Sequence, residues 1–117
     1  MEPITLAPNG NAPVIRETEE PVAPEGVRLY LHHFAGKLAN APIQSSRFTL
    51  EPYSATDEDK HAVNEIWFIS GGELDVCYDG TWHAVRNGES LYFAPWRPHF
   101  ARNNGTTQVQ VFSVWWA

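Results

Sequence analysis

Glycine-containing turns punctuate the second half of the chain at short intervals. Asp79-Gly80, Asn87-Gly88 and Asn104-Gly105 each separate two runs rich in β-branched and aromatic residues, and Gly71-Gly72 ends a further run. Such dipeptides favour tight hairpins because they tolerate the positive φ angles that these turns need. Short strands at regular spacing, without a convincing helical period, predict an all-β sandwich or small barrel.

The length of 117 residues is enough for one domain. Pro13, Pro21 and Pro24 interrupt any long helix near the N-terminus. We therefore expect a proline-rich arm over residues 1–26 and a single β-domain over residues 27–117. The arm is expected to wrap the domain or to pair with a neighbouring chain through short strands.

The charge and the cysteine content limit the partners and the compartment. The formal net charge is −6 with only eight Lys and Arg residues, whereas phosphate binding needs clustered cations, so no nucleic-acid partner is expected. No apolar run approaches the ~20 residues that span a bilayer, and the N-terminus does not resemble a signal peptide. The single Cys77 cannot form an internal disulfide, which fits the cytoplasm.

Residues 59–69 place charged groups on the face of an expected strand. Alternate residues share a face, so Asp59, His61 and Glu65 would lie on one side together with Trp67. A carboxylate that points into a barrel is costly unless it is paired or bound to a cation. Imidazole with carboxylate suits Zn, Fe, Mn, Ni or Cu, and the alternative is a hydrogen-bonded network without metal. His99, which a proline-stiffened bend presents, is the fourth candidate.

The first of two segments resembles the first motif of small single-domain cupins, which has the form G-x5-HxH-x3,4-E-x6-G. Asp59 stands at the first histidine position, His61 at the second, Glu65 at the glutamate and Gly72 at the closing glycine. Tyr53 stands where the motif opens with glycine.

The second segment resembles the second cupin motif, G-x5-PxG-x2-H-x3-N. Gly88, His99 and Asn103 match in register, Pro95 is one place late, and Trp96 stands at the inner glycine. The resemblance covers roughly residues 45–114. The shifted proline and the missing glycine put the shape of the bend before His99 in question.

The resemblance implies a cupin-type conical β-barrel, a double-stranded β-helix of two antiparallel sheets with one divalent transition metal in its wider mouth. It assigns His61, Glu65 and His99 as metal ligands. Asp59 replaces a histidine, so it is a fourth ligand, a catalytic base, a holder of water or of a substrate amine, or a solvated acid. The run D-x-H-x3-E-x-W is also similar to the cupin modules of hydrazine synthetases, which rearrange N-hydroxylated amino-acid conjugates.

Further residues are candidates for the pocket around this site. Asp59 and Glu65 are the candidate catalytic groups, and the aromatic content favours an apolar pocket. Trp115 and Trp116 are expected to pack or to form a dimer contact rather than to touch substrate. The candidate pocket residues are Trp67, Trp96, Arg97, Tyr30 and Arg47.

The sequence favours a metal-dependent enzyme acting on a small molecule by isomerisation or rearrangement, lyase chemistry or oxygenation, such as a tailoring step in biosynthesis. The alternatives are a non-catalytic module that binds a metabolite or sugar and a scaffold that has lost its metal. Ile66 and Phe68, on the second face of the strand, need cover together with the C-terminal VFSVWWA run. We therefore expect a homodimer.

Overall fold

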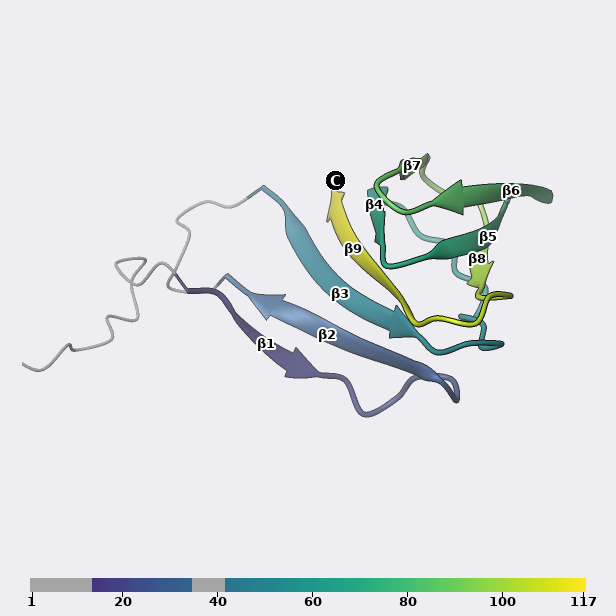
Figure 1. Cartoon of the computed structure of the whole chain (residues 1–117). Coiled ribbons are helices and arrows are strands. Elements are labelled where there is room, and N and C mark those ends of the chain that lie inside the picture. The colour runs from purple at the N-terminus through teal and green to yellow at the C-terminus, as the bar shows by residue number, and fades with distance from the viewer. Residues whose placement is uncertain (1–13, 35–41) are drawn as a thin grey trace, which may run out of the picture.

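The structure is a computed structural model that describes residues 14–34 and 42–117. These residues form two antiparallel sheets and no helix (Figure 1), so the described part contains no helix that could span a membrane. The larger sheet has the order β1-β2-β3-β9-β4-β7 and the smaller one β6-β5-β8. The strands are β1 (Arg16–Glu19), β2 (Val27–His33), β3 (Gln44–Leu50), β4 (Asn64–Ser70), β5 (Glu73–Tyr78), β6 (Thr81–Arg86), β7 (Ser90–Phe93), β8 (His99–Arg102) and β9 (Val109–Trp116).

The core fills the space between the two sheets. Alternate residues of each strand point inward, as the period of two requires. The all-β fold of two antiparallel sheets is confirmed, and the turn at Asp79-Gly80 joins β5 to β6 with φ angles of 50° and 84°. The fully buried side chains include Leu50, Leu74, Val76, Phe93, Val109 and Val111.

The expected N-terminal arm contributes a strand to the domain's own sheet. β1 pairs antiparallel with β2 and forms the outer edge of the larger sheet (Figure 1). Residues 1–13 lie outside the described part of the chain. The boundary at residue 26 stays a prediction. The pairing of β1 with β2 joins the two sides of this boundary in one sheet.

The strand that was expected to carry Asp59, His61 and Glu65 is shorter than the sequence indicated. β4 begins at Asn64, after a bend at residues 62–63, so Asp59 and His61 precede it. Asp59 instead forms an isolated bridge with His99, and its backbone N and O each lie 2.9 Å from the His99 partner atom. The common orientation of these groups therefore arises from the barrel and not from one continuous strand.

Two residues that replace glycines of the cupin pattern keep a glycine-like backbone. Tyr53 has a φ of 65° and Trp96 has a φ of 63°, both in the left-handed region. The bend before His99 is thus formed despite the loss of glycine, and the Trp96 amide donates to the His61 carbonyl at 2.7 Å. Gly72, the closing glycine of the first motif, packs so closely on β9 that a Cβ would lie 2.9 Å from Val109 Cγ2.

Candidate metal centre and adjoining cavity

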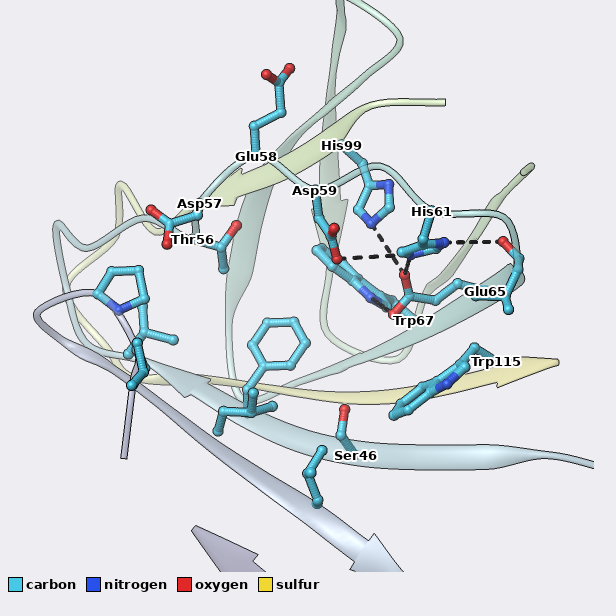
Figure 2. Close-up of a pocket in the computed structure, with 18 residues that line it drawn as sticks. Ser46, Thr56, Asp57, Glu58, Asp59, His61, Glu65, Trp67, His99 and Trp115 are labelled. Atoms are coloured by element: carbon cyan, nitrogen blue, oxygen red, sulfur yellow. Dashed lines mark hydrogen bonds and ion pairs between the residues drawn. The ribbon is translucent and has the colours of Figure 1, made fainter. Parts of the chain in front are cut away.

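Three polar side chains meet at one end of the barrel, with Asp59 beside them (Figure 2). Glu65 Oε1 lies 2.8 Å from His61 Nε2 and 3.1 Å from His99 Nε2. Asp59 Oδ2 lies 3.9 Å from His61 Nε2. The barrel thus brings together the four residues that the sequence singled out as metal ligands.

Backbone carbonyls and packing orient both imidazole rings. His61 Nδ1 lies 3.1 Å from the Val63 carbonyl oxygen, and His99 Nδ1 lies 3.1 Å from that of Arg97. The His99 ring also stacks on Phe93, with centroids 4.2 Å apart and an interplanar angle of 1°. Since a carbonyl oxygen only accepts, Nδ1 carries a proton in each ring, and Nε2 is the atom left to bind a cation.

The arrangement of acceptors explains why this cluster needs a positive charge. In neutral imidazoles with protonated Nδ1, both Nε2 atoms present lone pairs to the same carboxylate oxygen of Glu65. Three acceptors that face one another repel unless a proton or a metal ion lies among them. The geometry therefore fits a cation, either a proton or a metal ion, among these atoms.

Glu65 is held as a carboxylate. Its burial raises the pKa, but the hydrogen-bonding contacts with His99, Ser113, Trp67 and His61 outweigh burial and lower the pKa to about 2. Trp67 Nε1 donates to Oε2 at 3.0 Å, and the Ser113 hydroxyl donates to the same oxygen. Oε2 is thus occupied by neutral donors, which leaves Oε1 for the cation.

His99 and Asp59 differ in their surroundings. Burial lowers the pKa of His99, yet the hydrogen bond to Glu65 and the contact with the Arg97 carbonyl together raise it. The Asp59 side chain is 67% exposed, and its Oδ1 accepts from the Lys60 amide at 2.8 Å. Asp59 can therefore reach either the cation or a molecule that enters from solvent.

These residues fit a divalent transition metal. Asp59, His61 and His99 each offer one ligand atom, and the three atoms lie within 4.8 Å of one another. Ligand atoms on a common ion of this class lie roughly 3 Å apart, which is close to the Glu65–imidazole separations. Imidazole nitrogen with carboxylate oxygen suits Zn, Fe, Mn, Ni or Cu alike.

A cavity of about 510 Å³ adjoins the cluster (Figure 2). Trp67 lines it, as the sequence predicted. Tyr30 and Arg47 lie on the opposite face of the larger sheet, because their neighbours Leu29, Leu31, Ser46 and Phe48 take the inward positions. There the Arg47 guanidinium sits 4.1 Å above the Tyr30 ring and pairs with Glu17.

Trp96 and Arg97 also lie away from the cavity lining. The left-handed bend turns Trp96 toward solvent, where it is 61% exposed, and Arg97 pairs with Asp79 at 3.1 Å. Only the backbone of this bend contacts the site: the Arg97 carbonyl oxygen accepts from His99 Nδ1.

Several residues at the site were not identified from the sequence. Ser113 and Trp115 lie on the inward face of β9, and Trp115 lines the cavity rather than serving only as packing. The sequence contained a signal for Ser113. It is the single polar residue on a strand face that is otherwise apolar, formed by the alternate residues Val109, Val111, Ser113 and Trp115. Ser46 and Phe93 carried no such signal.

Comparison with known proteins identifies the family. Residues 46–115 match the family described as cupin domain, which covers more than half of the chain. The chain belongs to the cupin family. This cupin is 30% identical over 91 residues to the HTH-type transcriptional regulator SutR of Escherichia coli (strain K12), covering 78% of this chain and 46% of the regulator. The chain thus spans less than half the length of that relative.

Solved structures share the fold at low sequence identity. A predicted oxalate decarboxylase from Thermotoga maritima superposes with a TM-score of 0.70 and 22% identity, covering 88% of this chain and 97% of that one. The cupin domain of an XRE family transcriptional regulator from Enterobacter cloacae superposes with a TM-score of 0.66 and 20% identity, covering 80% of this chain and 98% of that one. The narrower likeness to hydrazine synthetases has no support among these relatives.

Proposed function

We propose that this cupin binds one divalent transition metal through His61, Glu65 and His99, with Asp59 as a fourth ligand, and acts as an enzyme on a small molecule in the adjoining cavity. The observation that carries this proposal is the approach of both Nε2 atoms to one carboxylate oxygen of Glu65. A hydrogen-bonded network without metal would need a proton among the same atoms.

The chain's own residues have separate tasks in this proposal. Bound there, the ion would supply Lewis acidity, which polarises an oxygen of the substrate. Asp59 is exposed and borders the cavity, so it can hold a proton taken from the bound molecule. Trp67 and Phe93 shield the inner side from water. Isomerisation or rearrangement, lyase chemistry and oxygenation all fit this arrangement, as does a tailoring step in biosynthesis.

A second candidate function is reversible ligand sensing. Its support is the likeness to two transcriptional regulators, one of them matched through its cupin domain. Sensing would use the same cavity without turnover. Consumption of a bound ligand, measured by chromatography on the metal-loaded protein, favours the enzyme, whereas saturable binding without consumption favours the sensor.

Metal analysis tests the shared part of both functions. We expect about one metal ion per chain in the purified protein and its loss in His61→Ala and His99→Ala, because each variant removes a proposed ligand. His83→Ala is the matched control, since His83 is exposed on β6 and does not line the cavity. No metal in the parent protein after reconstitution, or equal metal in all variants, would contradict the proposal.

We further propose that the protein is a cytoplasmic homodimer. The outer face of β4 and β9 exposes Phe68 and Phe112, which are cross-strand neighbours. Exposed apolar groups that adjoin one another favour a protein interface.

A further inference from the structure

The cavity has one apolar wall. β2 and the segment before it supply aliphatic side chains, and the inward face of β3 adds Phe48. Such a wall binds hydrocarbon and offers no hydrogen-bonding side chain to a sugar or another polyol. The aliphatic residues are Val22, Ala23, Pro24, Val27, Leu29 and Leu31.

The opposite side of the cavity is acidic. Asp57, Glu58 and Asp59 stand at its exposed rim, and Glu65 lies deeper, so four carboxylates line the cavity. Within the described residues, no Lys or Arg side chain lines it. Glu58 points outward in Figure 2, so it acts on a ligand through its field rather than by contact.

The negative charge would persist beside a bound metal ion. One divalent ion would offset two of the four carboxylates that line the cavity. The other two negative charges would remain around the cavity. They repel an anionic ligand and attract a cationic one. The apolar walls of the cavity have a low dielectric constant, so this electrostatic interaction acts over a longer distance than it would in water.

A serine hydroxyl is aimed into the same space. Ser46 is only 4% exposed as a residue, and its hydroxyl points into the cavity (Figure 2). Its cross-strand neighbour Ser113 donates to Glu65, whereas the Ser46 hydroxyl makes no hydrogen bond with the described residues. Because the Ser46 hydroxyl opens onto the cavity, it is available to a polar atom of a ligand.

From these observations we propose that the cavity takes an amphipathic organic molecule with a hydrocarbon body and a cationic amine, and that it discriminates against carboxylates. The hydrocarbon lies on the β2 wall, the ammonium group faces Asp57 at the rim, and a polar atom of the ligand meets Ser46. The inference rests on the proposed function for its site but not on the identity of the metal.

A series of six-carbon probes tests the charge preference. Hexylamine, hexan-1-ol and hexanoate have six carbon atoms each and differ in the charge of the head group. Their affinities for the protein as purified are measured by isothermal titration calorimetry at pH 7. We expect hexylamine to bind on the order of tenfold more tightly than hexan-1-ol, and hexanoate to bind most weakly. Hexanoate binding as tightly as hexylamine would overturn the proposal.

Chain length tests the apolar wall independently. From propylamine to hexylamine, each added methylene should tighten binding about fourfold, if it is fully buried against β2. An affinity that does not change with chain length would show that the amine binds only at the acidic rim, and it would overturn the assignment of the wall.

A rim variant with a matched control links the preference to named residues. Asp57→Asn should lower the ratio of hexylamine to hexan-1-ol affinity by roughly threefold, because it removes one of the rim charges. Glu73→Gln changes the net charge equally, but Glu73 begins β5 and does not line the cavity, so the ratio should stay as in the parent protein. An equal fall in both variants would assign the preference to overall charge and overturn the role of the rim.

The metal content of the same samples separates this inference from the proposed function. Metal present with a preference for hexanoate refutes the amine inference alone. Metal absent even after reconstitution, with a preference for hexylamine, refutes the metal proposal alone, because the carboxylates and the apolar wall line the cavity with or without the ion.

Discussion

Trp96 holds a backbone conformation that glycine ordinarily supplies, and the metal-site candidate His61 depends on that bend. The Trp96 amide donates to the His61 carbonyl at 2.7 Å, so the bend joins the two motif segments. A non-glycine residue in the left-handed region costs about 1–2 kcal/mol. The rest of the barrel imposes this conformation at the cost of some stability.

Trp96→Gly is therefore expected to stabilise the protein. Relief of the backbone strain exceeds the entropy that glycine adds to the unfolded chain, with a net gain of up to about 1 kcal/mol in the free energy of unfolding. The side chain is 61% exposed, so little packing is lost. Urea denaturation measures the change. Trp82→Gly, at an exposed tryptophan inside β6, is the control and should lower the free energy of unfolding. A similar decrease in Trp96→Gly would show that contacts of the Trp96 ring stabilise the fold.

Among the elements, β1 is joined to the sheet by a cluster of charged side chains on the outer face. Glu17 accepts from Arg47 Nε at 3.0 Å and from Arg47 Nη2 at 2.9 Å, and its Oε2 lies 2.9 Å from His32 Nε2. Tyr30 and Arg47, which the sequence placed in the pocket, thus serve this outer face. The segment after β1 supplies Val22, Ala23 and Pro24 to the cavity, so the attachment of β1 positions part of the apolar wall.

Glu17→Gln should loosen β1 without unfolding the barrel. Loss of the bidentate, partly exposed ion pair costs about 1 kcal/mol locally. The Glu20 amide donates to the Leu29 carbonyl at 2.8 Å and reports this opening, so its hydrogen exchange should be about fivefold faster. Glu19→Gln, at the more exposed pair with Arg28, should leave that exchange nearly unchanged. Equal rates in the parent and Glu17→Gln would contradict the attachment.

The same contact has a defined pH dependence. The hydrogen bond from Arg47 outweighs burial and lowers the pKa of Glu17 below its ordinary value of 4.5. A carboxylate with a lowered folded-state pKa stabilises fully above its unfolded value, and that contribution is lost as the pH falls through the lowered value. Protection of the Glu20 amide should therefore be constant between about pH 5 and 7, where Glu17 is ionised in both the folded and the unfolded state, and should decline only in more acidic solution.

At the scale of the whole molecule, the outer face of β7, β4 and β9 remains apolar. Phe68 is 47% and Phe112 is 39% exposed, and Tyr92 and Ile66 pair beside them across β4 and β7. The same strands present Glu65 and Ser113 on the inner face. Pairing of two chains through this face would thus brace the strands that carry the site.

Light scattering should give twice the 13.2 kDa of one chain. Phe68→Glu should shift the protein to the monomer, because it places charge in the centre of the apolar face. Trp82→Glu, at an exposed aromatic residue of the smaller sheet, is the matched control and should remain dimeric. A monomeric parent protein, or dissociation of the control alone, would show that this face is not the interface.

Local signals in the sequence accounted for the fold and for the residues of the metal-site candidate. The turns at Asp79-Gly80 and Asn87-Gly88 determine where strands end, since their positive φ angles depend on the residues themselves. The cost of burying Glu65 pointed to a cation before any contact was known. His61, Glu65 and His99 were named from their motif positions, and the structure brings them together.

The pocket was decided only by the tertiary structure. Tyr30 and Arg47 have the same β pattern as their inward neighbours, and only the pairing of β2 with β3 and β9 determines which parity faces the cavity. Trp115 and Ser46 reach the cavity through strands far apart in sequence. The sequence by itself determined the all-β class, the turns and the residues of the metal-site candidate, because these depend on local conformation and on the cost of burial. Which side chains surround a ligand depends on strand register and barrel closure, and these arise only when distant segments pair.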